Sequence, residues 1–242
     1  MAITPEIALI VVLITIIFLY TIKEFLGDLA ILSYFLWAFS NIEGSFKTAT
    51  FYALMLIFVM LVRGVKGYFG QTGLAISKSR WVGYRSKTLL LGVITGVGIW
   101  LGMRFVQGTV SASIIGVPSL AISSTSLSVT TVMLLGIVEN RAFFTVLDLL
   151  KENVSLFYSI PVFGNVCQIF SIILPQIVIG LAFGFYHIAV YSLSLSSIVW
   201  ASSVMIIWVL TRMLLKSDLA PNIAHALWNG TIALSRALGI AI

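Results

Sequence analysis

Few residues of this 242-residue chain can do acid–base or metal chemistry, because it has 8 acidic residues and 2 histidines. Both histidines, His187 and His225, fall in apolar stretches, and so does Glu139. Ionisable groups are costly in such surroundings, so each of them is a functional candidate. A glutamate and a histidine that lie together can deprotonate a water molecule, which is general-base catalysis.

Two pairs of residues with a spacing of four surround the histidines. Phe183 precedes His187 by four residues and Asn229 follows His225 by four, so each pair shares one face of a helix. The His225 imidazole and the Asn229 amide can donate hydrogen bonds to the oxyanion that forms when water attacks a carbonyl. Such residues suffice for peptide-bond hydrolysis. Alternatively, Glu139, His187 and His225 could hold a zinc ion with one open position, although no HExxH motif is present.

The order of these residues resembles the CPBP family, which includes CAAX prenyl proteases and bacteriocin-processing intramembrane glutamic proteases. A segment with Glu139 is followed by FxxxH at Phe183–His187 and by HxxxN at His225–Asn229. The resemblance covers residues 129–242. It implies that Glu139 and His187 activate water and that His225 and Asn229 form the oxyanion hole. The implied site uses no cofactor.

The first motif of that family, EExxxR, is only partly present. Glu139 matches its first glutamate, but Asn140 stands at the second and Phe144 at the arginine. The two replaced positions are four apart and would pair across one helix turn, so one ion pair is missing. Arg141 lies on a different helix face from Glu139. The departure leaves open a catalytically inactive relative with a structural or interaction role in a membrane complex. A transporter or proton relay with the same groups is a third hypothesis.

The elements that must position these residues are apolar helices. Hydrophobic residues make up 60% of the chain and charged residues 9%, too few to cover a water-soluble globule. The net charge of +6 is spread too thinly for a nucleic-acid surface. The composition therefore predicts an all-α fold, a polytopic transmembrane helix bundle of about seven or eight helices, with the lipid bilayer as its main partner.

Runs of apolar residues give eight candidate helices. They cover residues 7–22, 25–39, 49–62, 88–106, 129–150, 161–193, 196–215 and 222–242. The second is the weakest, because it is short and contains Asp28. The first lacks a basic start and a small-residue cleavage site, so we expect a retained helix. Gly92, Gly96, Gly98 and Gly102 predict close helix packing in the fourth.

Charge placement predicts the orientation and the division of the chain. The segment 63–87 contains basic residues and no acidic one, which makes it a cytoplasmic loop by the positive-inside rule. Its basic residues are Arg63, Lys66, Lys78, Arg80, Arg85 and Lys87. We therefore expect N-terminal transmembrane helices in residues 1–128, with this loop, and a CPBP-like core in residues 129–242.

The longest apolar segment has two interpretations. If residues 161–193 form one straight crossing, His187 and His225 lie at levels about 20 Å apart and cannot share a substrate. If Pro175 breaks the segment, residues 176–195 form a separate helix with His187 near its middle. Residues 154–175 then become a re-entrant or additional crossing. The residue types are compatible with both.

These observations predict a multi-pass integral membrane protein. Its expected function is that of a CPBP-like intramembrane glutamic endopeptidase that cleaves a peptide or the tail of a membrane protein. The expected catalytic residues are Glu139, His187, His225 and Asn229.

Overall fold

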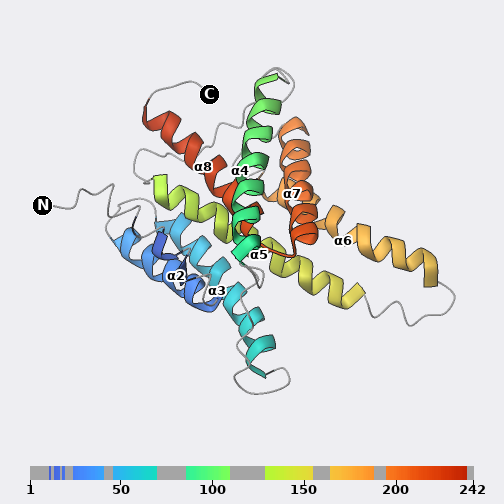
Figure 1. The fold of residues 1–242 in the computed structure, drawn as a ribbon. Helices are drawn as coiled ribbons and strands as arrows, with labels where there is room; N and C mark the ends of the chain where they lie inside the picture. Colours follow the sequence, from blue (N-terminus) through green and yellow to red (C-terminus); the bar gives the residue numbers. More distant parts are fainter. Residues whose placement is uncertain are drawn as a thin grey trace, which may run out of the picture. The chain divides into compact units, whose positions relative to one another are not determined.

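In the computed structural model, the elements with defined bounds are all α-helices. The structure describes residues 11, 14–16, 18–19, 24–40, 46–69, 86–109, 129–154, 164–187 and 195–238. The helices, shown in Figure 1, are α2 (Glu24–Ser40), α3 (Phe46–Phe69), α4 (Ser86–Thr109), α5 (Val129–Val154), α6 (Gly164–Tyr186), α7 (Leu195–Leu215) and α8 (Leu219–Ala237). These residues contain no strand, so the all-α prediction is confirmed.

Each predicted apolar segment from 25–39 onward overlaps one of these helices. Of the first segment, 7–22, the residues that the structure describes are helical. The weak second segment forms helix α2, with Asp28 buried in it. The predicted basic loop 63–87 is shorter than expected, because residues 63–69 belong to α3 and residues 86–87 to α4, while residues 70–85 lie outside the described residues, as do residues 110–128.

The interpretation with a helix break at Pro175 is wrong, because α6 runs through this residue from Gly164 to Tyr186. Proline removes only its own N–H from the helical ladder, and the neighbouring turns of a 23-residue helix keep their hydrogen bonds. The helix instead ends just before His187. His187 therefore lies at the end of α6, and not near the middle of a separate helix.

The chain forms two compact units that interleave along the sequence. The first unit comprises Met1–Trp100, Ser124–Ala142 and Leu215–Ile242. The second comprises Leu101–Ser123 and Phe143–Leu214. Helix α5 thus gives its first part to one unit and its second part to the other.

The core of the first unit is built by α2, α3, α5 and α8. Phe35, Leu56, Leu134 and Ala226 represent these four helices in one buried apolar cluster. Helices α2 and α3 pack side by side (Figure 1). The buried face of α2 explains why its apolar segment is helical in spite of Asp28, since a packed face stabilises a helix more than local propensity does.

Helix α4 packs against the start of α8 through two of the predicted glycines. A Cβ on Gly92 would lie 2.9 Å from Leu219 Cδ2, and one on Gly96 would lie 2.7 Å from the Ala220 carbonyl oxygen. Gly98 and Gly102 have nothing within 4 Å in that position. The packing role therefore holds for the first two glycines, whereas the other two lie over open space.

The second unit joins the end of α5 to α6 and α7. Phe144, Phe183 and Trp208 are buried here, one from each helix. Gly184 of α6 packs directly against the Ser202 side chain of α7. The phenylalanine of the FxxxH motif is therefore a core residue of this unit.

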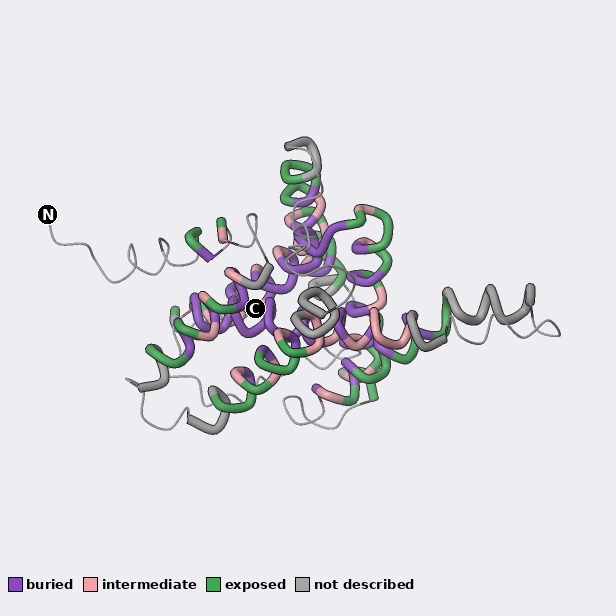
Figure 2. The backbone as a smooth tube through the Cα atoms, turned by 90° about the horizontal axis from the view of Figure 1, so that it is seen from below, coloured by how far each residue is buried: buried purple, intermediate pink, exposed green. Residues whose placement is uncertain are grey.

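Many helical turns are exposed (Figure 2), and a large number of the exposed side chains are hydrophobic, among them Leu90, Phe105 and Leu214. The stretches Leu89–Val106 of α4 and Ile198–Leu215 of α7 are long and apolar enough to cross a membrane. Shorter apolar helices cover Leu26–Trp37, Thr50–Arg63 and Ile173–Tyr186. Only 17% of the α4 stretch is buried, so most of its apolar side chains face outward. An outward apolar surface of this kind suits contact with lipid.

Candidate functional site

Three helices of the first unit meet at the Glu139 carboxylate, which is only 5% exposed. Its Oε1 accepts a hydrogen bond of 2.5 Å from the Tyr52 hydroxyl on α3. Its Oε2 lies 3.3 Å from Nε2 of His225 on α8. Both carboxylate oxygens thus have partners that approach from different helices.

Asn140, the next residue of α5, sets the tautomer of His225. The Asn140 amide nitrogen donates to the Pro221 carbonyl oxygen at 3.1 Å, so its Oδ1 must be the atom that faces His225. This Oδ1 lies 3.0 Å from Nδ1 of His225. Because an amide oxygen only accepts, Nδ1 of His225 carries the proton and donates it.

Glu139 and His225 therefore share one proton on the Nε2 side. Either Nε2 is protonated and the pair is carboxylate with imidazolium, or Glu139 is protonated and donates to a neutral ring. In the first state Glu139 is a base that is held beside a cation. In both states the proton shared by Glu139 and His225 can pass to a third group, and no other titratable side chain has to take part in that transfer.

The second HxxxN residue, Asn229, lies one turn further along α8. Its amide nitrogen is 3.5 Å from the Val132 carbonyl oxygen of α5. Gly136 of α5 makes room for this face, because a Cβ there would lie 2.8 Å from Asn229 Nδ2 and 2.9 Å from His225 Cδ2. The contacts of α5 and α8 run in opposite directions along the two sequences, so the helices pack antiparallel.

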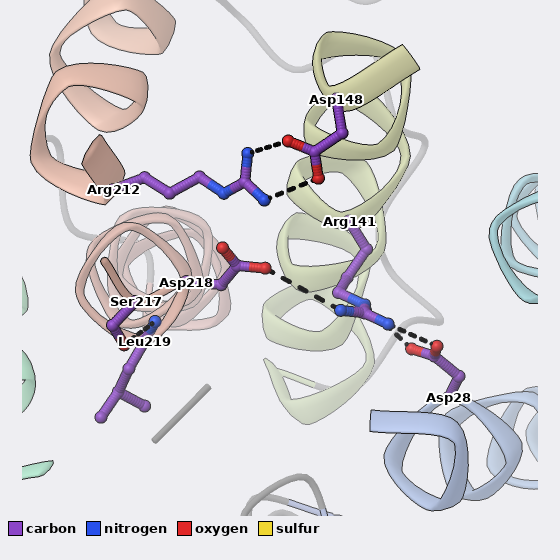
Figure 3. A network of polar contacts seen from close by, with 7 residues as sticks. All are labelled: Asp28, Arg141, Asp148, Arg212, Ser217, Asp218 and Leu219. Atoms are coloured by element: carbon purple, nitrogen blue, oxygen red, sulfur yellow. Dashed lines mark hydrogen bonds and ion pairs between the residues drawn. The ribbon is translucent and has the colours of Figure 1, made fainter. Parts of the chain in front are cut away.

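Arg141 is fully buried and bridges three elements of the first unit (Figure 3). Its Nε donates to Asp28 Oδ1 of α2 at 3.0 Å, and a second nitrogen bonds the other oxygen of this carboxylate at 2.5 Å. Asp218, just before α8, lies 3.9 Å from the remaining nitrogen. One guanidinium thus ties α2, α5 and the start of α8 together.

His187 belongs to the second unit. Its Nδ1 lies 2.8 Å from the Phe183 carbonyl oxygen, and the two rings are 4.1 Å apart between centroids. Because the carbonyl only accepts, Nδ1 donates and Nε2 keeps a lone pair. The FxxxH spacing thus gives a hydrogen bond that satisfies one of the last carbonyls of α6.

A second ion pair links α5 to α7 within this unit (Figure 3). Arg212 donates to both oxygens of Asp148 at 2.8 and 2.9 Å, and its guanidinium lies 4.9 Å from the centre of the Phe144 ring. Burial lowers the pKa of Lys151 at the end of α5, the charge of Arg212 lowers it further, and Asp148 opposes both.

The structure brings Glu139, His225 and Asn229 together in the first unit and places His187 in the second. Three partners were missed in the sequence, namely Tyr52, Asp28 and Arg141. Asp28 and Arg141 could have been recognised from the sequence, because they are charged residues within apolar segments. Tyr52 could not, because nothing in the sequence distinguishes it from the other tyrosines of a chain that has 8. Among the described residues no three His, Cys, Asp or Glu side chains gather as a metal site.

No family model, curated protein or solved structure matches the chain. Membership of the CPBP family therefore stays a prediction that rests on the motifs around Glu139, His187 and His225.

Proposed function

We propose that the protein is an integral, multi-pass membrane protein that acts as an intramembrane glutamic-type endopeptidase on a peptide or a membrane-protein tail. The observation that carries the proposal is the buried Glu139–His225 contact of 3.3 Å, with Asn229 on the same face of α8. A membrane location is supported by the outward apolar surface of α4 and by the apolar stretch of α7. In this proposal the basic segment 63–87 is cytoplasmic.

The proposed reaction is a hydrolysis in which Glu139 acts as general base. Glu139 takes a proton from water, and the hydroxide adds to the scissile carbonyl carbon. His225 Nε2–H and the Asn229 amide donate to the oxyanion. The C–N bond then breaks, and the proton from Glu139 goes to the leaving nitrogen. The role of His187 as a second base rests on the family resemblance alone.

Asn140 takes part in this proposal as a positioning residue. It holds the proton of His225 on Nδ1, so only Nε2 is directed toward Glu139. In the related family motif this position is a glutamate. The Asn140 amide therefore supports the site through hydrogen bonds, where the family motif has an ion pair. Phe144, at the arginine position, serves as a core residue.

A comparison of newly formed peptide ends tests the proposal. The full chain is reconstituted in liposomes with a peptide library and membrane-protein extracts, and new termini are identified by mass spectrometry. We expect termini that appear with the wild type and disappear with Glu139→Ala and with His225→Ala. A wild type that yields no more termini than Glu139→Ala would refute the peptidase.

One observation favours a second candidate, a catalytically inactive membrane protein with a structural or interaction role. Both Glu139 oxygens are engaged, by Tyr52 and by His225, and such a satisfied buried network can serve to specify helix packing. Glu139→Gln distinguishes the two candidates, because it keeps hydrogen bonding but removes the base. The peptidase loses turnover at unchanged thermal stability, whereas a purely structural network changes only in stability.

A further inference from the structure

The buried face of α8 carries a polar side chain that neither the fold nor the proposed reaction uses. Asn222 is 0% exposed. Neither its amide nitrogen nor its amide oxygen has a hydrogen-bond partner within the described part of the chain. A buried amide without partners destabilises a fold, so such a group in a native protein calls for a hydrogen-bonding molecule beside it.

A buried neighbour of Asn222 indicates what that molecule is. Asp218, just before α8, precedes Asn222 by four residues, and the Asn222 backbone N–H donates to the Asp218 carbonyl oxygen at 3.2 Å, so the two side chains lie on the same side of the first helical turn. The Asp218 carboxylate is buried as well, at 1% exposure. An internal water requires two to four polar partners. The Asn222 amide offers both a donor and an acceptor, and the Asp218 carboxylate offers a further acceptor.

We propose that the Asn222 amide binds an ordered water molecule at the buried start of α8, beside the Asp218 carboxylate. Asn222 precedes His225 by three residues, so this site lies about one helix turn from His225. If the proposed hydrolysis holds, the water bound at Asn222 replaces the reacting water after each turnover in an otherwise apolar bundle. That role rests on the proposed function, whereas the water site itself does not.

Ser202 of α7 provides a matched control. Its hydroxyl is buried and has no hydrogen-bond partner in the described part of the chain either. It packs directly against Gly184 of α6. Ser202→Ala therefore removes a polar group that lies against helix backbone, and we expect an unchanged or higher midpoint temperature of unfolding.

The test is a structure of the full chain in lipid nanodiscs at a resolution that shows ordered waters, for the wild type and for Asn222→Leu. We expect water density within hydrogen-bond distance of the wild-type amide, absent in the variant, with the Glu139–His225 contact retained in both. We expect the midpoint temperature of Asn222→Leu to fall by on the order of 2–4 °C. A dry Asn222, or a variant that behaves like Ser202→Ala, would overturn the proposal.

Water occupancy is independent of proteolysis, so the two proposals fail separately. A protein with the water but without new peptide termini keeps the water site and loses the peptidase. An active peptidase without a water at Asn222 keeps the proposed peptidase function and loses the water site. The wild-type structure alone decides the water site if Asn222→Leu does not fold.

Discussion

The Nε2 atom of His225 lies 3.3 Å from Oε2 of Glu139, and the tautomer of His225 is set by the residue next to that glutamate. Glu139 and Asn140 therefore act on one imidazole from two sides. The consequence is a single proton held between the carboxylate and Nε2, in surroundings where few other groups can exchange it.

Removal of the Tyr52 hydroxyl should destabilise the protein. Tyr52→Phe deletes a hydrogen bond to a carboxyl group, which is worth about 1.5–3 kcal/mol when the acceptor is charged. Tyr34→Phe is the matched control, because the Tyr34 hydroxyl is hydrogen-bonded to the neutral Thr131 hydroxyl of α5 at 3.0 Å. It should cost about 0.5–1.5 kcal/mol. The free energies of unfolding measure both, and an equal loss would argue for a neutral Glu139.

The close approach of α5 and α8 should depend on Gly136. Gly136→Ala places a methyl group against Asn229 and His225, which must shift, and we expect a loss of about 1–3 kcal/mol. The control is Gly98→Ala on α4, where the added carbon meets nothing within 4 Å. It should be neutral or stabilising by up to about 1 kcal/mol. Thermal unfolding of both variants checks the contrast, and a harmless Gly136→Ala would contradict the packing.

Loss of the Arg141 charge should be severe. Arg141→Leu leaves the buried carboxylates of Asp28 and Asp218 without their cation, which costs about 3–5 kcal/mol. The other ion pair is the comparison, because the Asp148 side chain is 27% exposed and keeps contact with solvent when Arg212 is replaced. Arg212→Leu should therefore cost less. Similar losses in the free energy of unfolding of the two variants, measured by chemical denaturation, would show that burial does not determine the cost of breaking each ion pair.

Restoration of the missing family ion pair should fail. The double change Asn140→Glu with Phe144→Arg replaces the amide that donates to the Pro221 carbonyl by a carboxylate that cannot donate. It also puts a second cation beside Arg212, which lies 4.9 Å from the Phe144 ring centre. Both positions are 0% exposed, so we expect a loss of about 3 kcal/mol or more. Phe144→Leu keeps the position apolar and should fold at a moderate cost. Yield of folded protein after detergent extraction is the measurement, and a stable double variant would be evidence against this packing.

The turn between α7 and α8 should gain stability from glycine. Lys216 has a φ of 51°, a left-handed conformation that costs an ordinary residue about 1 kcal/mol. Lys216→Gly should raise the free energy of unfolding by roughly this amount, because glycine adopts the conformation freely. Lys216→Ala keeps the Cβ and should bring no gain, so it separates backbone relief from loss of the lysine charge.

Local patterns were sufficient for the helices and for part of the site. Apolar runs predicted every helix from α2 to α8, because each needs a buried or lipid-facing apolar surface. The sequence left open whether Pro175 breaks the run 161–193, and the structure has one continuous helix there. The spacing of His225 and Asn229 predicted a shared helix face, and both side chains lie beside Gly136 of α5. The role of His187 in catalysis stays a prediction.

The partners of the site were beyond sequence reasoning, because they come from distant parts of the chain. Tyr52 lies 87 positions from Glu139, and Asp28 lies 113 positions from Arg141. Nothing local to either residue specifies such contacts, which depend on the order in which helices pack. Asn140 was interpreted as a missing glutamate, and its role in orienting His225 required the Pro221 carbonyl to be seen.

The interleaved units have a consequence for synthesis on the ribosome. Glu139 emerges well before His225, and α6 and α7 of the second unit are translated between them. During that interval the carboxylate has no imidazole to share its proton, and Arg141 has not yet met Asp218. A chain that ends after α7 therefore carries incompletely paired charges among apolar helices, and only the addition of Asp218 and α8 completes both contacts.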